Sequence, residues 1–273
     1  MKLLILSDLH LDTGDRFSTS DWTSERFIRK IDLIIALYGI DKVVLNGDVF
    51  DMINSPMKAI EHAQRDTMTY LKNIGAIFVQ GNHDIGYADG LRELVIENSR
   101  GATIRIEHGH KAEIFNGTKP GRVFVRVLMK AMKLLTKWNR LHNRYHKEVL
   151  IDDAVCGKPA YRSSDCFKYA HKLLRTNDVV VLGHTHRLEE SISYYGDDRK
   201  IYLNCGSCTK GKFQGVILDT ESLRYELLND LPEKHSTPKR IPALAGFSAM
   251  PHRPMPVSTF HRHASTFSTQ EQL

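Results

Sequence analysis

Residues 2–11 read Lys-Leu-Leu-Ile-Leu-Ser-Asp-Leu-His-Leu, an apolar strand that ends directly in polar residues. The pattern recurs twice: a strand at 41–45 runs into Asn-Gly-Asp, and a strand at 76–79 runs into Gln-Gly-Asn-His-Asp. Helical spacing separates these strands at 26–38 and 57–73. Alternating strands and helices predict a mainly parallel sheet covered by helices. Ligands bind beyond the carboxyl ends of the strands in such sheets.

The rest of the chain holds further short elements. We expect a short helix at 91–97 and a strand at 103–107. The second half is predicted to contribute one helix and five strands, which suggest an additional sheet packed on the first. These elements are the helix 165–174 and the strands 178–182, 191–195, 200–204, 213–218 and 224–228.

The composition is that of an ordinary folded protein. The 273 residues are 41% apolar and 26% charged, which excludes collagen, coiled coil and wholesale disorder. No apolar run approaches the roughly 18 residues of a membrane span, and Leu3–Leu6 is too short for a signal peptide. We therefore expect a cytoplasmic protein without a transmembrane segment. The four cysteines form no disulfide framework, and Cys-Gly-Ser-Cys at 205–208 is predicted to be a tight turn rather than a metal site.

The net charge of +6 is concentrated in one segment. Residues 121–149 contain eight Lys or Arg against one acid, spaced at the helical period opposite an apolar stripe that includes Phe124 and Trp138. We predict a long basic amphipathic helix with a buried apolar side, inside a helical insert of about 120–176. Six of the nine prolines follow residue 231, so 1–231 is the predicted domain and 232–273 a disordered basic tail.

Groups that bind metals follow five of the predicted strands. Carboxylates, imidazoles and one amide oxygen are ligands for borderline divalent ions such as Mn, Fe, Zn or Ni. Two such ions could activate water as hydroxide and neutralise the oxygens of a phosphoryl group. Any one of these residues, taken alone, could instead cap a helix or stabilise a turn. For Asp84 and His110, support of the ligand loops without metal contact is as good an interpretation as metal binding. The residues are Asp8, His10, Asp48, Asp51, Asn82, His83, Asp84, His108, His110, His184 and His186.

The five strand-end motifs resemble, in order, the signatures of the calcineurin-like metallophosphoesterase superfamily. They are Asp-Leu-His (8–10), Gly-Asp-Val-Phe-Asp (47–51), Gly-Asn-His-Asp (81–84), His-Gly-His (108–110) and Gly-His-Thr-His (183–186). The resemblance implies an α/β fold, a four-layer αββα sandwich, with the helical insert between the fourth and fifth motifs. It also implies a phosphoester or pyrophosphate hydrolase that uses two divalent metal ions, with Mn²⁺ favoured.

The resemblance assigns roles to individual residues. Asp8, His10 and His186 would bind the first metal, and Asn82, His108 and His184 the second, with Asp48 bridging the two. His83 would donate a proton to the leaving group or stabilise the phosphate charge, and Asp51 would orient that imidazole.

The layout is similar to the UDP-2,3-diacylglucosamine diphosphatase branch, which is peripheral to the membrane and holds acyl chains with inserted helices. This chain has His83 and Asp51 where that branch has Arg and Glu. His and Asp at these two positions are instead similar to the phosphatase and nuclease branches of the superfamily. A lipid-linked or membrane-surface substrate is therefore one hypothesis, at the inner face of the membrane. Predicted substrate-binding residues are Arg122, Arg126, Lys130, Trp138 and Asn204.

Two alternatives stay open. A nuclease or nucleotide phosphodiesterase could use the basic helix as a track for nucleic acid, although this does not explain the apolar stripe. A non-catalytic scaffold could keep the fold, but such members of the superfamily typically lack the catalytic histidine, whereas His83 and Asp51 are both present here.

Overall fold

Strand β1 (Lys2–Leu6) is the middle strand of its five-stranded sheet and contributes side chains to two separate cores. The computed structural model describes residues 1–14, 18–113 and 165–230, with a few positions between 118 and 131. Because successive side chains of a strand point to opposite faces, Leu3 and Ile5 enter one core and Leu4 and Leu6 the other. An apolar run buried on both faces indicates a strand inside a layered sheet.

The first sheet has the strand order β10–β9–β1–β2–β3. Strands β1, β2 (Lys42–Asn46) and β3 (Ile77–Val79) are parallel, so their carboxyl ends lie at one edge. Strands β9 (Phe213–Asp219) and β10 (Tyr225–Asp230) are antiparallel, and β9 pairs directly with β1. The sheet is thus mixed rather than mainly parallel, and the C-terminal strands extend it.

The second sheet has the strand order β4–β5–β6–β8–β7. It also has a parallel centre, in which β6 lies between β5 and β8, and antiparallel edge strands. The bounds are β4 Leu94–Glu97, β5 Thr103–Ile106, β6 Val179–Leu182, β7 Leu188–Tyr195 and β8 Asp198–Cys205.

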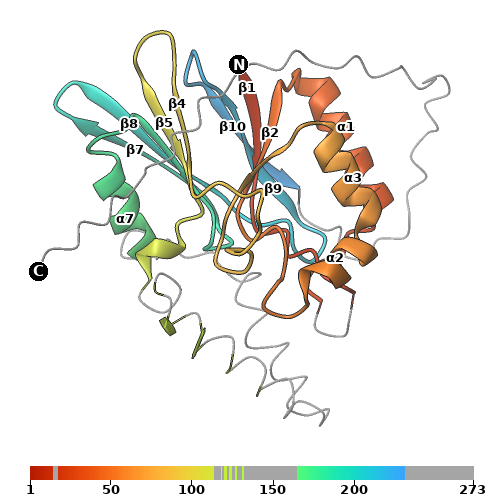
Figure 1. Ribbon diagram of the computed structural model, residues 1–273. Helices are drawn as coiled ribbons and strands as arrows, with labels where there is room; N and C mark the ends of the chain where they lie inside the picture. The colour runs from red at the N-terminus through yellow and green to blue at the C-terminus, as the bar shows by residue number, and fades with distance from the viewer. Residues whose placement is uncertain are drawn as a thin grey trace, which may run out of the picture. The chain divides into compact units, whose positions relative to one another are not determined.

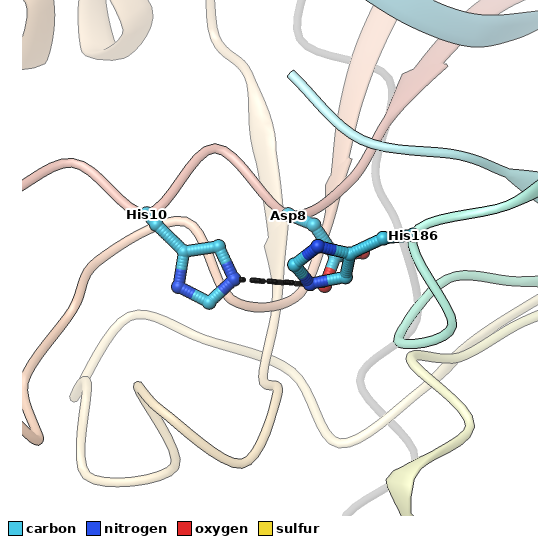
Figure 2. Close-up of side chains that lie close together, drawn as sticks. All are labelled: Asp8, His10 and His186. Carbon is cyan, nitrogen blue, oxygen red and sulfur yellow. Dashed lines mark hydrogen bonds and ion pairs between the residues drawn. The ribbon is translucent and has the colours of Figure 1, made fainter. Parts of the chain in front are cut away.

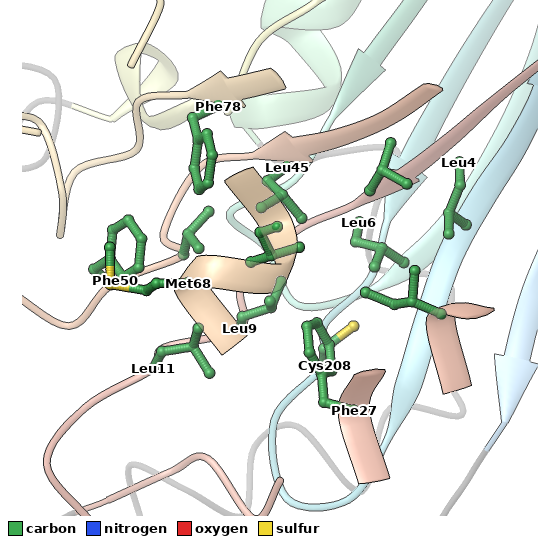
Figure 3. Close-up of a cluster of buried hydrophobic side chains, with 14 of the residues drawn as sticks. Leu4, Leu6, Leu9, Leu11, Phe27, Leu45, Phe50, Met68, Phe78 and Cys208 are labelled. Carbon is green, nitrogen blue, oxygen red and sulfur yellow. The ribbon is translucent and has the colours of Figure 1, made fainter. Parts of the chain in front are cut away.

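The two sheets pack face to face between helices, which confirms the four-layer αββα sandwich (Figure 1). Helices α1 (Ser24–Tyr38), α2 (Met57–Ala63) and α3 (Arg65–Asn73) cover the first sheet. Phe27 of α1 and Met68 of α3 reach Leu6 and Leu45 there (Figure 3). Helix α7 (Asp165–Leu173) covers the second sheet through Ala170.

Three expectations from the sequence need correction. Residues 91–97 contain strand β4 instead of a helix, because β-branched Val95 and Ile96 pair with β5 and only alternate residues face the core. The predicted helix 57–73 is two helices that meet at Gln64, where φ is −108°. The second sheet recruits β4 and β5 from the first half, while β9 and β10 belong to the first sheet.

Most of the predicted insert and all of the predicted tail from 232 lie outside the described residues. Phe124 is described, and its side chain is 58% exposed, so the expected burial of the apolar stripe is wrong at this position. Among the residues that the structure describes, no helix has both the length and the apolar character needed to cross a membrane.

Candidate metal centre

The carboxyl ends of β1, β2, β3, β5 and β6 bring the predicted residues together. Three groups of side chains have ligand atoms within 4.8 Å of one another. Asp8, His10 and His186 form the first ligand group, and Asp48, His108 and His184 form the second ligand group. A third set, His10, Asp48 and His83, joins the two.

The first ligand group is drawn from β1 and from the loop after β6. Figure 2 shows the rings of His10 and His186 directed toward each other, with the Asp8 carboxylate beside His186. The His10 and His186 Nε2 atoms are 3.3 Å apart, and His186 Nε2 is 3.1 Å from Asp8 Oδ1. This is the spacing of donor atoms that share one cation at about 2.0–2.2 Å each.

The second ligand group is almost fully buried. His108 donates its Nδ1–H to the Asn46 carbonyl at 2.8 Å, because a carbonyl oxygen can only accept. The lone pair of His108 Nε2 therefore points at Asp48 Oδ2, 3.1 Å away. Two atoms that carry lone pairs come this close when a cation or a proton lies between them.

Each central carboxylate has one oxygen held by the protein and one turned into the site. Asp8 Oδ2 accepts hydrogen bonds from the Ser7 hydroxyl and the His184 backbone N–H. Asp48 Oδ1 accepts the His83 backbone N–H at 2.8 Å, which leaves Oδ2 for the histidines. The buried side-chain atoms without a hydrogen-bond partner among the described residues include Asp8 Oδ1, Asn82 Oδ1 and His108 Nε2 at this site. These oxygen and nitrogen donors fit a pair of divalent cations.

Protons are unevenly distributed among these groups. Burial raises the pKa of Asp8, but His186 and His108 outweigh it and hold the pKa well below its usual range. Burial lowers the pKa of His108, yet Asp48 and Asp8 raise it to about 10. Divalent metals require deprotonated ligands, so binding at these residues would release protons.

His83 and Asp51 form an acid–imidazole pair beside the groups. His83 Nδ1 lies 3.0 Å from Asp51 Oδ1, and its Nε2 lies 4.0 Å from Asp48 Oδ2. Burial lowers the pKa of His83, but the charge of Asp48 and the hydrogen bond to Asp51 raise it to about 8. Asn54 donates its side-chain and backbone N–H to the Asp51 carboxylate and keeps it in place.

The backbone at the site is strained. Left-handed φ angles are uncommon for residues with a side chain and cost of order 1–3 kcal/mol each. Five residues of the two ligand groups have them: Asp8 (54°), His10 (48°), Asp48 (50°), His184 (69°) and His186 (55°). The surrounding loops hold these angles through backbone hydrogen bonds such as His10 N–H to Asp48 O at 2.9 Å.

Two motif glycines are needed because the ligand side chains pass directly over them. A Cβ at Gly81 would collide with the Asp48 carboxylate, and a Cβ at Gly183 would collide with the Ser7 hydroxyl. The missing side chain therefore leaves room for the Asp48 carboxylate at Gly81, and for the Ser7 side chain beside Asp8 at Gly183.

Asp84 and His110, for which the sequence left metal binding and loop support open, differ in their surroundings. Asp84 accepts the backbone N–H of Val49 at 2.7 Å and of Gly81 at 2.6 Å, so it braces the loops that carry the ligands. His110 is 6% exposed, and burial and the charge of His108 lower its pKa to about 3. It belongs to neither ligand group.

The structure describes one of the predicted substrate residues. Asn204 is fully buried, and its amide donates to the Gly183 carbonyl at 2.8 Å, so it stabilises a loop instead of facing a substrate. Arg122, Arg126, Lys130 and Trp138 lie outside the described residues. The Cys205–Cys208 segment begins at the last residue of β8, with Gly206 at φ 70° and both thiols buried.

Three residues that contribute to the geometry of this site were not predicted from the sequence. Ser7 hydrogen-bonds to Asp8, the Asn46 carbonyl orients His108, and the Glu113 carboxylate lies 3.2 Å from His184 Nε2. Ser7 stands directly before its partner, and that adjacency could have been a signal. The other two contacts join strand ends that are far apart in the sequence.

Comparisons with known proteins were made for the whole chain. Residues 1–188 match the family model described as calcineurin-like phosphoesterase. None of the curated proteins compared with the chain matches it.

Similar solved structures cover 85% of this chain. They are a dimetal phosphatase from Danio rerio (10% identity, 99% of that chain, TM-score 0.44), Vps29 complexed with zinc from Entamoeba histolytica (16%, 100%, 0.41) and the phosphoesterase Yfce from E. coli (16%, 100%, 0.39). The matched family model spans more than half of the sequence and includes all five motifs. The chain therefore belongs to the calcineurin-like phosphoesterase family of metal-dependent hydrolases.

Proposed function

We propose that this chain hydrolyses a phosphoester or pyrophosphate bond with two divalent metal ions held by the two ligand groups. Asp8, His10 and His186 bind the first ion. Asn82, His108 and His184 bind the second, and Asp48 lies between the two. The observation that supports this most is that side chains from five strand ends form three overlapping groups, each with its ligand atoms within 4.8 Å of one another.

The metals supply the central chemistry, because a pair of divalent ions activates water and neutralises charge on the phosphoryl oxygens. Mn²⁺ is the ion we expect first, since the ligand set mixes carboxylate oxygen, amide oxygen and imidazole nitrogen. The protein's own part is to hold the ligand side chains in a strained, preformed arrangement. The left-handed φ angles of Asp8, Asp48 and His184 support this.

His83 serves as the acid. Its Nδ1–H is donated to Asp51 at 3.0 Å, and its pKa of about 8 keeps a second proton on Nε2 at neutral pH. That proton faces the site beside Asp48 and can pass to the leaving-group oxygen or stabilise a phosphate oxygen.

The substrate is attached to a lipid or presented at an anionic membrane surface. Val123, Phe124 and Val127 occupy helical positions and are 58–61% exposed, an apolar surface that a lipid can cover. Arg122, Arg126, Lys130 and Trp138 belong to the same stretch of sequence, and basic residues at a membrane surface attract anionic headgroups.

The hydrolase proposal is tested with full-length protein stripped by a chelator and reloaded with Mn²⁺. We expect cleavage of p-nitrophenyl phosphate or bis-p-nitrophenyl phosphate that depends on the added metal. Inactivity on both substrates with Mn²⁺, Fe²⁺, Zn²⁺ and Ni²⁺ would contradict the proposal.

The substrate class is tested by flotation with phosphatidylglycerol-containing liposomes and by activity on nucleoside diphosphate-linked lipids. Phe124→Glu combined with Val127→Glu should abolish flotation, whereas Val95→Glu, at a 50% exposed position on β4, should not. The nuclease alternative is favoured if the chain instead binds single-stranded DNA in a salt-sensitive manner. In that case, changing Lys130, Lys133 and Lys137 to Glu should remove the binding.

A further inference from the structure

Glu113 lies outside the five motifs and yet contacts the second ligand group. Its Oε2 is 3.2 Å from His184 Nε2, and the side chain of His184 is 9% exposed. Glu113 comes five residues after His108, at the end of the short 3₁₀ turn η1 (His110–Ala112). The Glu113 N–H donates to the His110 carbonyl at 3.3 Å, so this turn sets where the carboxylate stands.

The position of Glu113 distinguishes a supporting residue from a metal ligand. The atoms of Asp48, His108 and His184 lie within 4.8 Å of one another, and Glu113 is not a member of that group. Its carboxylate thus contacts Nε2 of His184 without belonging to that group of ligand atoms. A neutral imidazole has one N–H and one lone pair, and a carboxylate accepts the N–H.

We propose that Glu113 is a positioning residue for metal binding: it accepts the Nε2–H of His184 and so turns Nδ1 toward the second ion. This rests on the proposed function. His108 shows the complementary arrangement, because the Asn46 carbonyl accepts its Nδ1–H and leaves Nε2 for the metal. The two histidines of the second ligand group thus present opposite ring nitrogens, each selected by an oxygen acceptor behind it.

The test uses full-length protein and measures Mn²⁺ affinity by titration calorimetry and electron paramagnetic resonance. The Glu113 side chain is 44% exposed, so its replacement leaves no buried cavity. In Glu113→Ala, we expect one of two Mn²⁺ sites to weaken about 10–100-fold while the other keeps its affinity. Glu113→Gln keeps an oxygen acceptor and should stay within a few-fold of wild type. Glu25→Ala, a 78% exposed carboxylate on α1, is the matched control.

A second readout follows the ring nitrogens directly. Protein labelled with ¹⁵N-histidine and loaded with Zn²⁺ should show one site histidine bound through Nδ1, and in Glu113→Ala that signal should change or vanish. Unchanged affinity of both sites in Glu113→Ala overturns the inference. Equal loss of affinity in Glu113→Gln and Glu113→Ala also overturns it, because that result is expected of a direct metal ligand. A wild-type protein that binds no pair of metal ions would instead overturn the proposed function itself.

Discussion

The two ligand groups differ in how firmly the protein holds them. In the first, the His186 side chain is 23% exposed, whereas in the second the three side chains are at most 9% exposed. Both histidines of the second group have an oxygen acceptor behind the ring, the Asn46 carbonyl and the Glu113 carboxylate. Because such partners fix ring orientation and raise ligand basicity, we expect the second group to bind its cation more tightly.

The largest effect is expected from replacing Asp48, because side chains of both ligand groups lie close to it. Its Oδ2 lies 3.1 Å from His108 Nε2 and 4.0 Å from His10 Nε2. Asp48→Asn should lower the rate roughly 10⁴-fold or more, because a charge shared by two cations is lost. Metal content measured by atomic emission should fall below two ions per chain. Asp198→Asn, at the start of β8, should keep both the rate and the two ions. Full activity in Asp48→Asn would be incompatible with a shared ligand.

His83 is the next largest test, because it stands where the two groups meet. His83→Gln should reduce the turnover of p-nitrophenyl phosphate about 10²- to 10⁴-fold, which is typical for the loss of a general acid. Two Mn²⁺ ions per chain should remain. A loss of one ion in this variant would show that His83 is a ligand, as its grouping with His10 and Asp48 also allows.

Gly183→Ala sharpens the difference between the groups. The new methyl group would collide with the Ser7 hydroxyl and displace Asp8, a member of the first group. We expect a roughly 10–100-fold loss of affinity at the weaker site and a loss of about 1–3 kcal/mol in the free energy of unfolding. Mn²⁺ titration and urea denaturation measure the two effects. Gly86→Ala, where the nearest atom is 3.7 Å from the added Cβ, is the control and should change neither.

The smallest effect concerns pH. His83 acts in its protonated form, so its contribution is complete well below its pKa of about 8 and is lost as the pH rises through that value. Asp51→Asn removes one of the charges that raise this pKa, so the basic limb of the rate profile should move to lower pH. A loss of about tenfold is expected at pH 8, with much less at pH 6. If the basic limb of the rate profile does not move in Asp51→Asn, then Asp51 does not control the pKa of His83.

The site was more predictable than the sheets. Residues such as Asp8, Asp48 and His184 could be placed because carboxyl ends of parallel strands meet at one edge. Strand β4 was missed because Leu94–Glu97 is too short for its alternation to outweigh a helical interpretation. The return of β9 to β1 is a tertiary pairing that local sequence does not encode. Glu113 was missed for the same reason, since its partner lies 71 positions later.

The pairing of β9 with β1 has a consequence for biosynthesis. Strand β1 is completed on one side by residues 213–219, which are made much later than residues 2–6. Contacts between distant parts of a chain form late, since loop closure must precede them. A growing polypeptide that carries Asp8 and His10 therefore lacks both a finished sheet and its His184 and His186 partners. We therefore expect metal binding to begin only after His184 and His186 have been made.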